Sequence, residues 1–137
     1  MTDGKVVRSP LLNQVLGSDT TEFAVHEFHS PGAPNALPRG GIPLHRHRTE
    51  DEAWYILAGA LAFRFGAEEF TAPAGSGVLL PHGTPHTFWN PGTGPVRYLL
   101  IVRPKTEALL RVLHAPSRPG GPALKDVYAR YDADLME

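Results

Sequence analysis

The chain contains no cysteine among its 137 residues. Disulfide frameworks, thiolate metal sites and cysteine nucleophiles are therefore excluded. No apolar run approaches the ~18 residues of a membrane-spanning helix, and residues 1–8 lack the long apolar stretch of a signal peptide. We therefore expect a cytoplasmic protein with no membrane partner. Thirteen basic and fourteen acidic residues leave a formal charge of -1, so there is no electrostatic case for a nucleic-acid partner.

Glycine, proline and histidine, in contrast, are plentiful. Fourteen glycines and fourteen prolines make up about a fifth of the chain, which favours tight turns and short strands over long helices. The apolar fraction of 42% and the charged fraction of 20% are typical of a globular protein. A chain of this length fits one compact domain, so we expect residues 1–137 to form a single domain.

Short apolar runs separated by turn residues dominate the first three quarters of the sequence. Glycines and prolines stand between the runs, for example at Gly59, Gly66 and Pro73. Many closely spaced short strands predict an all-β sandwich or barrel. The predicted strands cover residues 5–8, 12–16, 21–29, 42–47, 52–58, 60–65, 68–72, 77–80, 85–90 and 96–103, and residues 30–41 form a predicted loop.

Near residue 105 the hydrophobic period changes from that of a strand to that of a helix. Residues 106–114 have apolar side chains at helical spacing, with Thr106 as a candidate cap. Residues 123–135 place apolar side chains at i, i+3, i+4, i+7 and i+11, which predicts an amphipathic helix whose apolar stripe either covers the core or forms a substrate lid. The stripe consists of Leu124, Val127, Tyr128, Tyr131 and Leu135.

Four side chains form a candidate metal centre. His45 and His47 lie two residues apart in a run of strand character, so their imidazoles point to the same side. Glu52 begins the next predicted strand, and His86 begins another strand far along the chain. Three neutral imidazoles and one carboxylate suit a divalent transition metal (Fe, Mn, Ni, Co, Cu or Zn) and leave coordination positions open for a substrate.

The same residues fall into two sequence motifs. The first, G-x5-H-x-H-x3–4-E-x6-G, is matched by His45, His47, Glu52 and Gly59. The second, G-x5-P-x-G-x2-H-x3-N, is matched by Gly75, Pro81, Gly83, His86 and Asn90. Together these motifs resemble those of the cupin superfamily.

One position departs from the motifs. Arg39 stands where the first motif opens with a glycine, although glycines follow at positions 40 and 41. That glycine is a turn residue and not a ligand, so the departure concerns loop geometry. The six-residue spacing to Gly59 selects Glu52 as the carboxylate over Glu50 and Asp51, which we interpret as solvated turn residues.

The resemblance implies a jelly-roll β-barrel (a double-stranded β-helix) over about residues 5–104. A tail with one or two short helices would then occupy about residues 105–137. It also implies one divalent metal ion per chain, held by His45, His47, Glu52 and His86. Cupins pair apolar sheet faces, so the resemblance further implies a homodimer, formed through the face that carries Tyr55 and Leu57 with either residues 96, 98, 100 and 102 or residues 99 and 101.

Strand alternation indicates which side chains surround such a metal. If Glu52 points into the barrel, residues two and four positions later point inward too, and residue 88 shares a face with His86. These aromatics either line a pocket for a hydrophobic small molecule or simply fill the barrel. The predicted substrate-pocket residues are Trp54, Ile56, Phe63, Phe65 and Phe88.

The leading functional hypothesis is a mononuclear metal dioxygenase, resembling the quercetinase-like cupins. Its substrate would be a small hydrophobic enol or polyphenol-like molecule, with Glu52 as a ligand or as the catalytic proton acceptor. The first alternative is a non-redox cyclase or isomerase, resembling the small cupins of aromatic polyketide pathways. The second is a small-molecule-binding cupin without turnover. The remaining histidines (His26, His29, His82 and His114) are interpreted as surface or ordinary strand residues.

Overall fold

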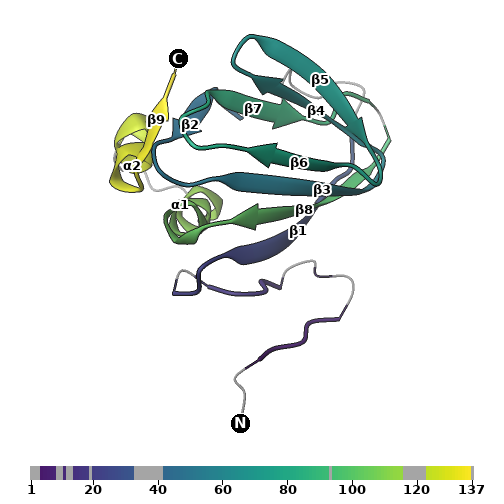
Figure 1. Cartoon of the computed structure of the whole chain (residues 1–137), viewed down its shortest axis with the longest axis horizontal. Coiled ribbons are helices and arrows are strands. Elements are labelled where there is room, and N and C mark those ends of the chain that lie inside the picture. Colours follow the sequence, from purple (N-terminus) through teal and green to yellow (C-terminus); the bar gives the residue numbers. More distant parts are fainter. Residues whose placement is uncertain are drawn as a thin grey trace.

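Two antiparallel sheets face each other in the computed structural model of the chain (Figure 1). The structure describes residues 4–8, 11, 14–18, 20–32, 42–92, 94–115 and 123–136. One sheet has the strand order β1-β8-β3-β6, and the other has the order β5-β4-β7-β2-β9. The fold is mostly β with two short helices, and it is the jelly roll that the motifs imply.

The predicted strands of the central region are confirmed with small shifts of their ends. Residues 52–58, 60–65 and 77–80 form strands with the predicted bounds. The strands are β1 (Ala24–Ser30), β2 (His45–His47), β3 (Glu52–Ala58), β4 (Ala60–Phe65), β5 (Glu68–Pro73), β6 (Gly77–Leu80), β7 (His86–Trp89), β8 (Val96–Val102) and β9 (Ala133–Leu135).

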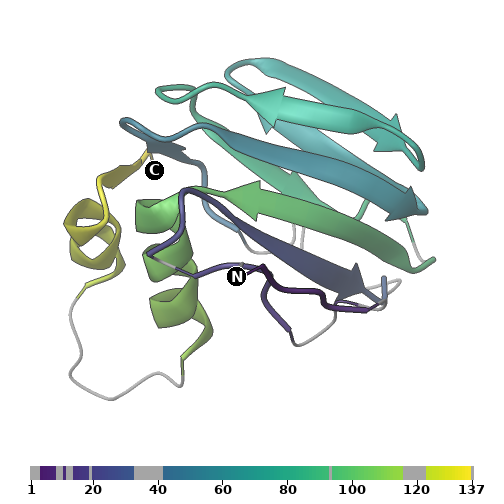
Figure 2. The same cartoon turned by 60° about the horizontal axis from the view of Figure 1, so that its bottom comes forward.

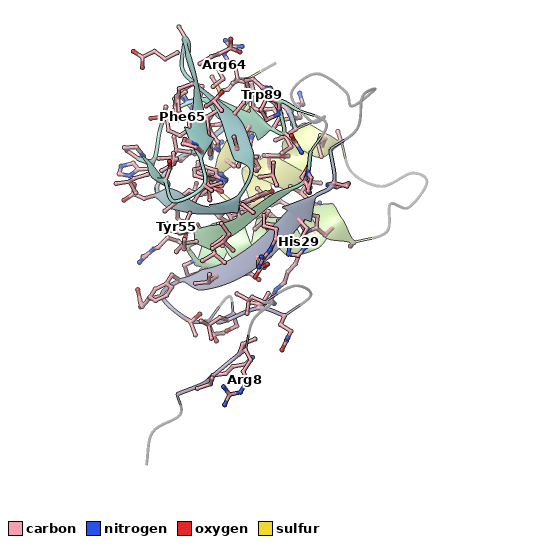
Figure 3. The ribbon with its side chains drawn as sticks, turned by 90° about the vertical axis from the view of Figure 1, so that its right-hand side faces the viewer. Arg8, His29, Tyr55, Arg64, Phe65 and Trp89 are labelled. Atoms are coloured by element: carbon pink, nitrogen blue, oxygen red, sulfur yellow. The ribbon has the colours of Figure 1, made fainter. Side chains whose placement is uncertain are left out.

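The weak strand predictions near the N-terminus were wrong where the structure describes them. Residues 5–8 form no strand, and Arg8 lies away from the two sheets (Figure 3). Of the run 12–16, Leu16 makes an isolated bridge with Val25, while residues 12 and 13 lie outside the described part of the chain. Residues 33–41 of the predicted loop and the 116–122 linker also lie outside it.

The core lies between the sheets and follows from the alternation of side chains along each strand. In β3, Trp54 and Ile56 point inward and are almost fully buried, whereas Tyr55 points outward and is 43% exposed. Alternating burial also continues along the whole of β8. The buried core consists of Ala24, Trp54, Ile56, Leu61, Phe63, Ala72, Leu80, Val96, Tyr98, Leu100 and Val102.

The two helices lie side by side at one end of the sandwich (Figures 1 and 2). Helix α1 (Pro104–His114) begins with a proline, whose missing N–H costs nothing at a first helical position. Thr106 is therefore the third residue of the helix and not its cap. Helix α2 is Leu124–Arg130. Neither helix is long and apolar enough to span a membrane.

The predicted second helix is too long, because its last residues form β9. Asp132 adopts a left-handed conformation (φ 63°), which ends the helix and turns the chain. Residues 133–135 then pair with β2, with Arg46 opposite Asp134. This strand gives the short β2 a partner on the side away from β7. Of the apolar stripe, Val127 and Tyr128 are buried in a small second core with Leu109 and Ala133, whereas Leu124 is 47% exposed.

Part of the outer face of the four-stranded sheet, over β3, β6 and the end of β8, is apolar and partly exposed, whereas Glu27, His29 and Arg97 occupy the neighbouring part. Tyr55 (Figure 3) and Leu79 project from β3 and β6, and Leu79 is 68% exposed. Of the two alternatives for β8, Leu99 and Ile101 share this outer face, since Leu99 pairs with Tyr55 and the alternate residues are buried in the core.

Gly59 offers a test of the turn between β3 and β4. Its φ is +76°, and a Cβ there would lie 2.5 Å from the carbonyl oxygen of Pro95. Gly66 also has a positive φ (+59°), but a Cβ there meets nothing within 4 Å. Left-handed backbone costs alanine about 1–2 kcal/mol, so we expect Gly66→Ala to lower the free energy of unfolding by about that amount.

We expect Gly59→Ala to lower the free energy of unfolding at least twice as much, because the backbone clash adds to the conformational cost. Urea unfolding of both variants, followed by circular dichroism, measures the difference. Equal losses in the two variants would show that the contact with Pro95 is unimportant.

Candidate metal centre

The three predicted histidines converge at the end of the sandwich where the helices lie. His45 and His47 come from β2, and His86 comes from β7, where it pairs directly with His45. A nitrogen atom from each of the three rings lies within 4.8 Å of the others. All three side chains are buried. Pairing of β2 with β7 therefore brings together ligands that are distant in the sequence.

Glu52 reaches the same point from the opposite sheet, as the first residue of β3. Its Oε2 lies 3.2 Å from Nε2 of His86 and 3.4 Å from Nε2 of His47. Ligand atoms about 2.1 Å from one ion and at right angles to each other lie about 3 Å apart. These separations are therefore compatible with Glu52 as a ligand of the same ion.

The ring nitrogens that face away from the cluster are held by hydrogen bonds. Nδ1 of His45 donates to the carbonyl of Pro43 (2.8 Å), and Nδ1 of His86 donates to the carbonyl of Thr84 (3.0 Å). Because a carbonyl only accepts, these nitrogens carry the ring protons, and the Nε2 lone pairs are available to a metal. Nδ1 of His47 instead faces the hydroxyl of Thr106, 3.4 Å away in α1.

The protonation states also suit metal binding. Burial is the main cause, and the nearby His86 the second cause, of a pKa of His45 that is lowered to about 3. This imidazole is therefore neutral at pH 7. Burial alone would raise the pKa of Glu52, but the imidazoles of His47 and His86 outweigh it and lower that pKa below its usual range. A neutral imidazole and an anionic carboxylate are the forms that bind a cation.

Two buried atoms of the cluster fit a bound ion. Oε2 of Glu52 and Nε2 of His86 are buried without a hydrogen-bond partner. Leaving a buried polar group unpaired costs about 1–3 kcal/mol. A cation between the two atoms would satisfy both, since each offers a lone pair. The three-histidine cluster is thus compatible with a metal ion, and iron, manganese, cobalt, nickel, copper and zinc all accept such donors.

A cavity of about 340 Å³ opens onto this cluster. It extends from the ligands toward α1 and α2, and most of its wall is apolar. Among the described residues, no lysine or arginine lines it. The wall consists of Phe28, Ile42, Pro43, His45, His47, Glu52, Phe88, Tyr98, Leu100, Thr106, Leu109, Leu110, Leu113, His114, Leu124 and Tyr128.

Of the predicted pocket residues, Phe88 lines this cavity and the other four do not. Trp54, Ile56 and Phe63 are at most 1% exposed and belong to the hydrophobic core. Phe65 packs against the same core. The four residues face inward as alternation requires, but they fill the space between the sheets outside this cavity.

Two tyrosines line the cavity, although sequence reasoning did not name them as pocket residues. Tyr98 is an inward residue of β8, and Tyr128 belongs to the apolar stripe of α2, where its ring lies 5.3 Å from that of His45. Burial, reinforced by the charge of Glu52, raises the pKa of Tyr128 to about 12 and also raises that of Tyr98. Both phenols therefore stay protonated at neutral pH.

The two acidic neighbours of Glu52 differ in their surroundings. Asp51 is exposed, as expected, and bonds to the backbone and ring of His82, which is exposed too. Glu50, which was expected to be solvated, instead accepts the backbone N–H groups of Lys105 and Thr106 at the start of α1. The sequence around Glu50 does not indicate that this residue contacts a helix that begins far along the chain, so this contact could not be predicted.

The remaining histidines also differ from one another. His29 is exposed and bonds to Glu27, and His114 is exposed at the cavity rim. His26 is a partly buried residue of strand β1 and bonds to the fully buried Glu107 of α1.

Two facing sheets with three convergent histidines at one end define a jelly roll whose site is compatible with a metal ion. Residues 36–102 match the family model of the cupin domain. This part of the chain is therefore similar to the cupin domain, as the motifs imply. The chain is also 34% identical over 61 residues to an uncharacterized protein of Methanocaldococcus jannaschii, a match that covers 44% of this chain and 49% of that protein. The aligned region thus spans about half the length of that relative.

Solved structures of low sequence identity share the fold. A protein with a double-stranded β-helix domain from Klebsiella pneumoniae aligns with a TM-score of 0.54 at 19% identity, over 74% of this chain and 83% of that one. The Cnp3 cupin domain of Schizosaccharomyces pombe aligns with a TM-score of 0.53 at 16% identity, over 74% and 70%. A sugar phosphate isomerase of Silicibacter pomeroyi aligns with a TM-score of 0.51 at 21% identity, over 61% and 51%.

We expect His86→Ala to weaken metal binding by more than about 100-fold. Loss of a ligand's hydrogen-bond partner lowers metal affinity by about 10–100-fold, and loss of the ligand itself should lower it further. The measurement is the metal content of chelator-treated protein after reloading with one divalent metal and desalting. His82→Ala is the matched control, since it removes an exposed histidine of the same motif and should retain wild-type metal content. Equal metal content in both variants would contradict the assignment of His86.

Proposed function

We propose that this chain is a mononuclear metal dioxygenase acting on a small hydrophobic enol or polyphenol-like molecule. The observation that carries the proposal is an apolar cavity whose wall includes His45, His47 and Glu52, three buried members of the candidate metal centre that His86 completes. A bound divalent metal would polarise substrate oxygens and, if redox active, would pass electrons to dioxygen. In a dioxygenation both oxygen atoms enter the substrate, so no external reductant is required.

The cavity wall supports this substrate class. Its apolar side chains come from both sheets and both helices, for example Phe28, Phe88 and Leu109. Phosphate groups are normally held by arginine or lysine, and none lines the cavity among the described residues. A phosphorylated sugar, the substrate that the name of the Silicibacter pomeroyi neighbour suggests for that protein, is therefore disfavoured here. The volume of about 340 Å³ lies within the usual range for small-molecule sites.

Five residues of the cavity wall have a role in this proposal. Glu52 is the fourth metal ligand, or it accepts a proton from a substrate hydroxyl at the same position. Tyr98 and Tyr128 stay protonated and donate hydrogen bonds to substrate oxygens. Leu109 and Leu113 of α1 exclude water from the reacting groups.

A non-redox cyclase or isomerase is the second candidate, and the two phenols favour it. A protonated phenol stabilises a developing enolate without any change of oxidation state. In that case the metal would act as a Lewis acid only, and a redox-inert ion such as zinc would suffice.

Oxygen uptake separates the two candidates. We expect protein reloaded with iron, nickel or copper to consume dioxygen in step with loss of a flavonol or related enol. Glu52→Gln should reduce the rate by about 100-fold or more. A panel of enols that gives no uptake with any of these metals would contradict the dioxygenase proposal. Turnover of a polycarbonyl substrate by zinc-loaded protein without oxygen would support the cyclase instead.

We also propose that the apolar part of the outer face of the four-stranded sheet pairs with the same part of a second copy. Tyr55, Leu57 and Leu79 are exposed on it, and Leu99 and Ile101 continue it across β8. Such an apolar patch is suited to a two-fold contact, in which the same patch of each copy faces the other.

We expect light scattering to give twice the 14.9 kDa mass of one chain. Leu79→Lys should shift the protein toward the single-chain mass, because it buries a charge in the contact. Val112→Lys, at an exposed valine of α1, is the control and should remain a dimer. A wild-type mass of one chain would contradict the proposal.

A further inference from the structure

His47 differs from the other two candidate ligands in what holds its ring. His45 and His86 each donate from Nδ1 to a backbone carbonyl two residues earlier in the chain. The backbone next to each of these two rings therefore orients the ring, and no other element of the fold is needed for this. Nδ1 of His47 instead contacts the hydroxyl of Thr106, which lies 59 residues further along and belongs to α1.

Thr106 is in turn held by Glu50. Both carboxylate oxygens of Glu50 already accept backbone N–H groups at the start of α1, from Lys105 (3.0 Å) and Thr106 (2.7 Å). The hydroxyl of Thr106 lies 2.9 Å from Oε1 of Glu50 and donates to it. Its lone pairs are then available to accept the Nδ1–H of His47, which leaves Nε2 of His47 to face Glu52 and the metal position.

We propose that Glu50 and Thr106 are a positioning pair, which orients His47 toward the metal and couples the docking of α1 to metal binding. The inference rests on the metal centre proposed above and not on the reaction. Glu50 lies in the connection between β2 and β3, so the pair joins the ligand-bearing strands of the barrel to the helix.

The coupling follows from what α1 contributes. The helix supplies Leu109, Leu110 and Leu113 to the cavity wall, and its first backbone donors are satisfied by Glu50. If α1 moves away, His47 loses the partner that fixes its ring, and the metal loses a correctly oriented ligand. By thermodynamic linkage, a metal that prefers the docked helix must stabilise docking by the same factor. Metal binding and closure of the cavity wall would thus occur together.

The test compares two substitutions of Thr106. Thr106→Val removes the hydroxyl, whereas Thr106→Ser keeps it. Metal-free protein is titrated with cobalt(II) at fixed pH, and binding is followed by visible absorption. We expect Thr106→Val to weaken cobalt binding by about 10–100-fold, the usual effect of losing a ligand's hydrogen-bond partner. Thr106→Ser should bind close to wild type. Asp51→Ala, which removes an exposed carboxylate of the same turn, is the matched control and should not change binding.

Two further readouts separate positioning from general loss of stability. Nitrogen NMR of metal-free protein should show the His47 proton on Nδ1 in wild type and spread over both nitrogens in Thr106→Val. Cobalt should slow amide hydrogen exchange in α1 of wild type, and this effect should shrink in Thr106→Val. If Thr106→Val does not fold, Glu50→Gln, which weakens the same bonds, replaces it and should also lower cobalt affinity.

Several outcomes would overturn the inference. The inference is wrong if folded Thr106→Val binds cobalt as tightly as wild type, or if Thr106→Ser binds cobalt as weakly as Thr106→Val. It is also wrong if cobalt does not slow amide hydrogen exchange in α1 of the wild type. A wild-type protein that binds no cobalt would overturn the metal centre as well. Absence of oxygen uptake in protein that passes these tests would reject only the proposed reaction.

Discussion

The structure depends on one constraint: three imidazoles and a carboxylate are buried at the end of an otherwise apolar sandwich. Burying such groups is unfavourable unless each polar atom has a partner. The outward nitrogens of His45 and His86 meet backbone carbonyls, while Nε2 of His86 and Oε2 of Glu52 face the centre without one. The barrel thus provides partners for the outward nitrogens of His45 and His86, and the unpaired inward atoms are compatible with a bound cation.

The same constraint explains why the C-terminal tail packs where it does. Strand β2 has only three residues, two of which are candidate ligands, and β7 pairs with it along one side. The tail supplies the other partner through β9, and α1 and α2 cover the apolar end of the cavity. The tail thus completes both the sheet that carries the ligands and the wall that a substrate would meet.

Much of this arrangement could be predicted from local patterns. Strands β3, β4 and β6 are short apolar runs with turn residues at their ends, and the spacing of the motifs selected His45, His47, Glu52 and His86. Strand β9 could not be predicted, since residues 123–135 keep a helical period and only the open side of β2 favours a strand there. Trp54 was correctly predicted to point into the barrel. Alternation does not determine how far along the barrel a side chain lies, so the position of Trp54 outside the cavity could not be predicted.

The cavity has two kinds of wall, and they have different origins. Some lining residues, such as Phe88 and Tyr98, belong to strands of the barrel, whereas others, such as Leu113 and Leu124, belong to the two helices. Under the proposed function, the candidate ligands would face the oxygens of a substrate and the apolar side chains of the helices would contact its hydrophobic body. Since the positioning pair ties α1 to His47, a change in the helical wall would alter the geometry at the metal as well as the fit of the substrate. Selectivity and metal chemistry would then depend on the same helix.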